Sequence, residues 1–227
     1  AGDLNFKVYA ATNSNRKTQF ILETNIGSVS RLTSDFYEDV YDNTQWTFAV
    51  RTKPRESPYA SQVTSSDVFD LEFYGVNHSA GYKVHEFTAS AEVNLNAGIG
   101  QFITGSNKRL YLGADRTNIT GAVNHKSNVR LVSSRVWFDY LEDEELRNHS
   151  KDVTTFGRLH PYRNSFIYEN GESGSYVPRI STLALHWNFE NITTSDTNGK
   201  FLVQDITSGS SFSVDPRFGG GEYSKYV

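Results

Sequence analysis

Acidic side chains at two places in the sequence are the first candidates for chemistry. Retaining glycosidases need two carboxylates about 5 Å apart across the scissile bond, and acids on one strand share a face only when they alternate. Asp70 and Glu72 alternate in this way, but the next position on that face, 74, is Tyr. Four consecutive acids lie at the expected start of a helix, where they favour the helix dipole and fan out into solvent: Glu142, Asp143, Glu144 and Glu145. The sequence therefore predicts no catalytic residues and no enzymatic activity.

Cysteine, histidine and serine motifs are the next candidates. The chain has no Cys, which excludes disulfides, thiol catalysis and thiolate metal sites. Its 6 His residues are scattered and lack the spacing of a zinc site on a helix. Residues 171–174 (GESG) do not complete the G-x-S-x-G elbow of a serine nucleophile. Neither zinc chemistry nor serine catalysis is predicted.

Aromatic residues make up 14% of the chain, a composition that suits half-buried strands. Trp46, Trp137 and Trp187 lie in patterned apolar runs, so we expect them to pack in a core. Tyr side chains in predicted loops could instead stack on sugar rings through their apolar faces. The candidate carbohydrate-binding residues are Tyr59, Tyr82 and Tyr162.

Length and charge limit the classes of function. The 227 residues suffice for one large β domain, or for one domain and part of another. The 22 Lys and Arg residues against 26 Asp and Glu give a net charge of −4 without a basic cluster, so we expect no nucleic-acid partner. No apolar stretch approaches the roughly 18 residues that cross a bilayer, so we expect no membrane insertion. Because it contains no Met, the chain is expected to be a segment of a longer protein or a processed product.

Period-two alternation of apolar and polar residues recurs along the chain and predicts many short strands. One clear example is 4–10 (LNFKVYA). Further strands are predicted at 19–24, 45–51, 67–76, 86–93, 99–104, 108–113, 128–140, 183–189 and 201–206. Acids at the start and basic residues near the end of 141–149 predict one short helix. The predicted fold class is all-β, an antiparallel β-sandwich with one short helix.

The order of several motifs resembles the laminin G-like and concanavalin A-like jelly-roll modules. Residues 41–50 (YDNTQWTFAV) place a Trp-centred strand after an Asp-Asn turn, as these modules do. Residues 109–114 (RLYLGA) and 120–123 (TGAV) are similar to the l-y-i-G strand and the f-x-G-x-i turn of the family. Residues 129–146 (VRLVSSRVWFDYLEDEEL) are similar to its closing strand and helical turn. The resemblance covers roughly residues 1–158 and implies a jelly roll.

A second stretch, 183–210, resembles the opening of another such module. We therefore predict a laminin G-like module at 1–158, a linker rich in Pro and Gly at 159–182, and the start of a second module at 183–227. Strands within 183–206 could alternatively return to complete the first sandwich. The chain also resembles large structural proteins of marine tailed bacteriophages, which carry such modules in series.

The resemblance also implies where a cation would bind. Laminin G-like modules often hold one Ca²⁺ at a rim loop through Asp side chains and backbone carbonyls. Asp42 and Asp115 are the candidate metal ligands on this basis. Ordinary turn chemistry, in which Asp caps its own backbone, is the alternative and the one we favour. No cofactor other than Ca²⁺ is expected.

These features predict a non-enzymatic structural or adhesive module of a larger multi-module protein. The resemblance implies a bacteriophage virion component (tail, fibre or capsid-decorating) or another extracellular surface. The expected partners are other subunits of that assembly. A lectin-like module that binds carbohydrate, with or without Ca²⁺, is the alternative.

Overall fold

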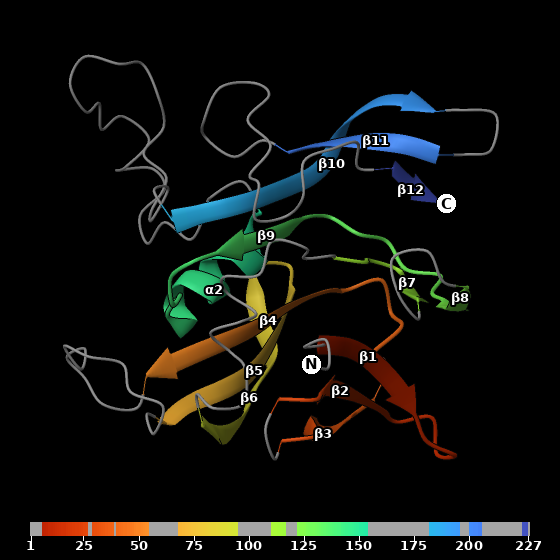
Figure 1. Cartoon of the computed structure of the whole chain (residues 1–227). Coiled ribbons are helices and arrows are strands. Elements are labelled where there is room, and N and C mark those ends of the chain that lie inside the picture. The colour runs from red at the N-terminus through yellow and green to blue at the C-terminus, as the bar shows by residue number, and fades with distance from the viewer. Residues whose placement is uncertain are drawn as a thin grey trace. The chain divides into compact units, whose positions relative to one another are not determined.

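The computed structural model describes residues 6–26, 29–38, 40–54, 68–94, 110–116, 122–153, 182–195, 200–205 and 224–226. These residues form antiparallel strands and one short helix (Figure 1), which confirms the predicted all-β class. The chain divides into two compact units, unit 1 (Ala1–Ile103 and Tyr140–Pro178) and unit 2 (Thr104–Asp139 and Arg179–Val227). Within the described ranges, no helix has the length and apolar character needed to cross a membrane.

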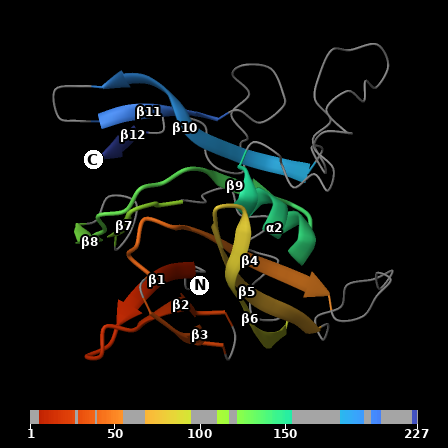
Figure 2. The same ribbon diagram turned by 180° about the vertical axis from the view of Figure 1, so that it is seen from behind.

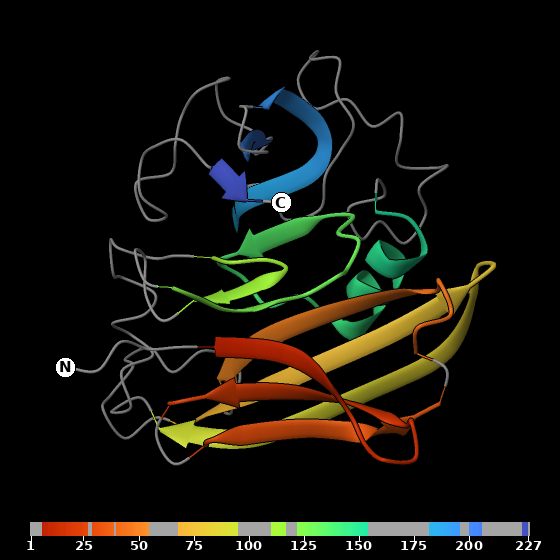
Figure 3. The same ribbon diagram turned by 90° about the vertical axis from the view of Figure 1, so that its right-hand side faces the viewer.

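Unit 1 is a sandwich of two three-stranded antiparallel sheets. The first sheet has the order β1 (Phe6–Thr12), β2 (Thr18–Thr24) and β3 (Arg31–Tyr37). The second sheet has the order β4 (Gln45–Pro54), β5 (Val68–Ser79) and β6 (Tyr82–Asn94). Figure 3 shows them as separate layers, the first in red to orange and the second in orange to yellow. The antiparallel sandwich is confirmed, and the jelly-roll order of connections stays a prediction.

The core of unit 1 lies between these two sheets. Phe20 of β2 and Leu71 and Phe73 of β5 point into it, and all three are buried. Trp46 of β4 packs against the same core, with its ring centroid 4.5 Å from that of Phe20. Because the odd-numbered residues of β5 point inwards, the intervening residues, such as Glu72, lie on the outer face of the second sheet.

The second sheet is regular between β4 and β5, and the pairing of β5 with β6 has one register shift, at Asn77 and His78. β4 pairs with β5 over all 10 of its residues without a shift in register. β5 and β6 form a hairpin that turns at Ala80 and Gly81, both with positive φ (49° and 81°). A two-residue type I′ turn requires positive φ at both positions, and its twist matches that of the flanking strands. The sheet therefore presents its outer residues in fixed rows.

One helix, α2 (Asp143–Lys151), packs against β4 and β5. The opposite views in Figure 1 and Figure 2 both show it beside these strands. The backbone N–H of Glu142 donates a hydrogen bond to Glu145 Oε2 (2.8 Å), so an acid of the first turn caps the helix. The short helix predicted at 141–149 is confirmed, with its bounds two residues later.

Unit 2 contains a two-stranded and a four-stranded sheet. β7 (Ala114–Arg116) pairs with β8 (Val123–Lys126). The four-stranded sheet has the order β12-β11-β10-β9, formed by β9 (Ser134–Trp137), β10 (Leu183–Ser195), β11 (Lys200–Asp205) and β12 (Ser224–Tyr226). The pairing of β9 with β10 joins residues that the sequence analysis assigned to different modules. The module boundaries at 158 and 183 stay predictions.

Most strands lie where alternation predicts them. The strand predicted at 128–140 is wrong over most of its length, since only residues 134–137 are in a strand. Residues 110–113 of the run predicted at 108–113 are not in a strand, and 99–104 lies outside the described residues. β3, β7, β8 and β12 are strands that the alternation does not predict.

Trp46 offers a test of the sandwich core. Its ring packs on Phe20, Tyr37 and Phe48, so Trp46→Ala should lower the free energy of unfolding by about 3 kcal/mol. Urea unfolding measures this loss. The matched control is Phe36→Ala, because Phe36 is half-exposed and should contribute little. Equal stability of the two variants would contradict the placement of Trp46 in the core.

Candidate functional site

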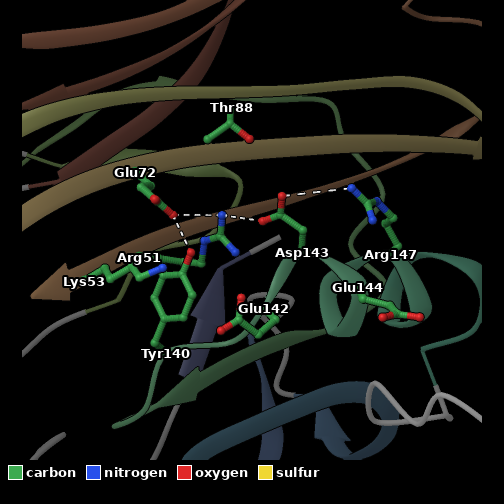
Figure 4. Close-up of a pocket in the computed structure, with 9 residues that line it drawn as sticks. All are labelled: Arg51, Lys53, Glu72, Thr88, Tyr140, Glu142, Asp143, Glu144 and Arg147. Atoms are coloured by element: carbon green, nitrogen blue, oxygen red, sulfur yellow. Dashed lines mark hydrogen bonds and ion pairs between the residues drawn. The ribbon is translucent and has the colours of Figure 1, made fainter. Parts of the chain in front are cut away.

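A polar pocket of about 540 Å³ lies on the outer face of the second sheet of unit 1. Three strands, helix α2 and the segment just before the helix all contribute to it (Figure 4). Its lining residues are Arg51 and Lys53 of β4, Glu72 of β5, Thr88 of β6, Tyr140, Glu142, and Asp143, Glu144 and Arg147 of α2. It is the candidate functional site, since charged and aromatic side chains converge there.

The strand register brings opposite charges together at the floor of this pocket. Arg51 lies directly opposite Glu72, and Lys53 lies opposite Asp70. These residues share the outer face because they alternate with the core residues of the same strands. Cross-strand pairs of opposite charge are favourable in an antiparallel sheet. The sequence therefore places two cations and two acids in adjacent rows under the helix.

Arg51 is the central group of the pocket, and only 7% of its surface is exposed. Its Nη2 lies 2.9 Å from Glu72 Oε2 and 2.7 Å from Asp143 Oδ1, and its Nη1 donates a hydrogen bond to the Leu141 carbonyl (2.7 Å). Its guanidinium also lies over the Tyr140 ring, 4.7 Å from the centroid. A buried cation is tolerated only when paired and hydrogen-bonded, and both conditions are met. Figure 4 shows the two ion pairs.

The prediction that the acidic run fans out into solvent is wrong for Asp143. Its carboxylate turns back onto the sheet and pairs with Arg51, and its other oxygen lies 4.0 Å from Arg147 Nη2. Glu145 is used as the helix cap. The run therefore attaches the helix to the strands, in addition to complementing the helix dipole.

A second charge cluster anchors the middle of α2 to β5 and β6. Glu86 pairs with Arg147 and Lys83, and it accepts a hydrogen bond from the hydroxyl of Tyr74 (2.6 Å). Burial alone would raise the pKa of Glu86, but the hydrogen bonds from Lys83, Tyr74 and Arg147 outweigh it and lower this pKa to about 2. Glu86 is therefore held as a carboxylate and is unsuited to donate a proton near neutral pH.

Tyr140 completes the polar network of the pocket. Its hydroxyl donates a hydrogen bond to Glu72 Oε2 (2.8 Å), and its pKa is raised, first by burial and then by this bond. Lys53 Nζ lies 5.1 Å from the centroid of the same ring. Stacking of a sugar in this pocket would need the Tyr140 ring, and two cations already interact with that ring.

A buried Ser–His pair joins the end of β5 to the last turn of α2. Ser150 Oγ lies 2.6 Å from His78 Nδ1 and donates a hydrogen bond to the Arg147 carbonyl (2.7 Å). Because this hydroxyl has one proton, Nδ1 carries the proton of the imidazole and donates it to Ser150. His78 Nε2 is then a bare acceptor, buried and without a partner. His78 is 8% exposed and Ser150 is 4% exposed, so the pair is inaccessible to a substrate.

The candidate metal ligands predicted from the sequence lie in different units. Asp42 precedes β4, and its Oδ1 accepts hydrogen bonds from the backbone N–H (2.9 Å) and hydroxyl (2.7 Å) of Thr44. These bonds lower its pKa and are ordinary turn chemistry. Asp115 lies on β7 in unit 2. In the part of the chain that the structure describes, no three His, Cys, Asp or Glu residues are grouped to hold a metal ion. The roles of Asp42 and Asp115 as ligands stay predictions.

The candidate carbohydrate-binding residues are only partly covered by the structure. Tyr82 begins β6 beside the hairpin turn and is 78% exposed. Tyr59 and Tyr162 lie outside the described residues. Tyr82 does not line the pocket of unit 1.

Comparison with known proteins gives no match: no family model, no curated protein and no solved structure aligns significantly with this chain. The resemblance to laminin G-like modules stays a prediction. Functional inference therefore rests on the geometry of the site.

His78 gives the site a measurable pH dependence. Its pKa is lowered, first by burial and then by the nearby cations Lys151, Lys83 and Arg147, with Glu86 opposing them. Below about pH 6.5 His78 binds a proton in the unfolded chain more readily than in the folded protein. The free energy of unfolding should therefore fall as the pH drops below that value. His78→Asn keeps the N–H donor to Ser150 but cannot titrate.

Urea unfolding between pH 7.5 and pH 5 tests this expectation. His78→Asn should reduce the decline in stability, and the remainder is expected from buried His186, whose pKa is lowered to about 4. His125→Asn, a variant of an exposed residue, is the control. An unchanged decline in His78→Asn would show that His78 is not the titrating group.

Proposed function

We propose that this chain is a non-enzymatic structural or adhesive module of a larger multi-module protein, in a bacteriophage virion or another surface assembly. The observation that carries the proposal is the pairing of charges in the pocket. Arg51 binds Glu72 and Asp143, and Arg147 binds Glu86. The strongest polar interactions of the site therefore hold α2 on the sheet.

The same geometry argues against glycoside hydrolysis. That reaction needs one carboxyl group that keeps its proton near neutral pH and a second that stays ionised, facing each other across a cleft. Glu72 Oε2 is already engaged by both Arg51 and Tyr140. The pKa of Glu86 is lowered rather than raised. Neither acid is arranged as a proton donor.

Exposed apolar side chains support a role in adhesion. Phe48 and Val50 point to the inner side of edge strand β4 and are 37% and 38% exposed. Apolar side chains gathered on a surface commonly mark contacts with other proteins. The resemblance of the motif order to modules of phage structural proteins supports the same role.

Carbohydrate binding is the second candidate, and one observation favours it. Tyr41 and Tyr82 are 75% and 78% exposed. They belong to neighbouring turns at one end of the second sheet, because Gln45 at the start of β4 lies opposite His78 near the β5–β6 hairpin. Exposed Tyr rings are suited to stacking on sugars. Glycan binding that Tyr82→Ala abolishes would favour this candidate over the structural one.

Matched variants of two acids test the non-enzymatic proposal. Glu72→Gln weakens the partner of a buried cation and should lower the free energy of unfolding by about 2 kcal/mol. Glu144→Gln alters an exposed acid of the same pocket and should change it by less than about 0.5 kcal/mol. Neither variant nor the wild type should release reducing ends from β-glucans or galactans.

Urea unfolding and a reducing-end assay on the same three proteins give both readouts. Release of reducing ends by the wild type that disappears in Glu72→Gln would overturn the proposal and make Glu72 a catalytic residue. A stability loss in Glu72→Gln without any hydrolysis supports it.

A further inference from the structure

β4 is an edge strand of unusual regularity. It lies at one end of the sheet order β4-β5-β6 and pairs only with β5 among the described residues. Its other edge therefore presents backbone N–H and C=O groups to a further strand. With 10 residues and no shift in register, it is long enough to form a complete ladder.

Exposed edges of this kind are normally protected. Proteins shorten their edge strands, insert bulges, or place Lys and Pro in them to prevent pairing with other chains. β4 has Lys53 and Pro54 only at its end, and its centre carries the exposed Phe48 and Val50. A long edge without bulges that carries exposed apolar side chains is a site for strand addition.

The sequence of β4 is complementary to itself. Antiparallel pairing of two copies about a two-fold axis at Ala49 places Phe48 of each copy opposite Val50 of the other. On the outer face it places Arg51 opposite Thr47 and Lys53 opposite Gln45. Apolar side chains meet apolar ones, and no two like charges face each other across the seam.

Neighbouring registers do not pair Phe48 with Val50. An axis at Arg51 would bring the two Arg51 side chains directly opposite each other. An axis at Thr47 would place Val50 opposite Thr44, outside the strand. An axis at Val50 would place Phe48 opposite Thr52, and an axis at Phe48 would place Val50 opposite Trp46, which packs against the core. An axis that falls between two residues would join the inner face of one sheet to the outer face of the other. The register centred on Ala49 is the one that pairs the two exposed apolar residues with each other.

We propose that two copies of this chain associate through β4 in this register, forming one continuous six-stranded sheet across a two-fold axis at Ala49. The inference rests on the proposed structural role and names its partner, which is a second copy of the same module. An isologous contact of this kind is the commonest way for identical chains to associate. It covers Phe48 and Val50 and completes the hydrogen bonding of the free edge.

Single cysteine variants test the register directly, because the chain contains no Cys of its own. In the proposed pairing the two Ala49 Cα atoms lie about 4.5–5.5 Å apart, a separation that a disulfide spans. Thr52 of one copy lies opposite Trp46 of the other, so the two Thr52 residues are about 20 Å apart. Ala49→Cys should form a covalent dimer under mild oxidation or with a short bis-maleimide, and Thr52→Cys should not.

Sedimentation velocity of the full chain supplies the second measurement. Val50→Lys should weaken self-association at least tenfold, while Val84→Lys, which alters an exposed Val of β6, should leave it unchanged. Circular dichroism checks that both variants fold.

Two results would overturn the inference. One is equal cross-linking of the two cysteine variants. The other is a wild type that stays monomeric while neither variant is cross-linked. A monomeric chain that also releases no reducing ends would still satisfy the proposed function and would require a different partner for β4. If the wild type released reducing ends and Glu72→Gln did not, the proposed function would be overturned, whether or not β4 pairs with a second copy.

Discussion

The buried guanidinium of Arg51 is the constraint on which the outer half of unit 1 depends. Arg51 lies on the outer face of strand β4, whose inner face packs against the apolar core, and it is almost entirely shielded from water. An isolated charge in such a place would cost several kcal/mol of stability, so partners must be brought to it. Glu72 comes from the neighbouring strand, whereas Asp143 and the Leu141 carbonyl come from residues about 90 positions later. The position of α2 follows from this requirement.

Two further contacts fix the direction of the helix once its start is held. Arg147 in the middle of α2 pairs with Glu86 of β6, and Ser150 in the last turn is bonded to His78 of β5. The helix is thus attached at its beginning, middle and end to different strands. The helix therefore covers the outer face of the sheet through paired charges. Among the described residues, no strand pairs with the outer edge of β4, and the proposed function therefore concerns contact rather than chemistry.

Alternation in the sequence is enough to predict the strands that bury one apolar face. β1, β2, β4 and β5 all show it, and the order of charges predicts α2. Alternation does not predict β3, because a polar residue occupies one of its core positions. Ser34 is buried there and accepts a hydrogen bond from the Phe20 backbone N–H (2.9 Å), which makes a hydroxyl acceptable in the interior. A pattern that scores apolar residues cannot detect such a position.

The site is less predictable than the fold because its partners are far apart in the chain. Arg51 within an apolar run and an acidic helix start at Asp143 are each visible in the sequence. Their pairing depends on how the helix packs on the sheet, which no local pattern reports. The same holds for His78 and Ser150, whose interaction forms only when α2 is docked. The exposure of Tyr82, by contrast, follows from its place beside a hairpin turn.

Amide hydrogen exchange in an Arg51→Met variant tests the central claim most directly. Met retains much of the length of the side chain and removes the charge, so the core of the sandwich should be preserved. If Arg51 holds the helix, the amides of residues 146–151 should lose protection while those of β2 and β5 keep it. Unchanged protection of the helix amides would contradict the account, and so would loss of protection in helix and strands together.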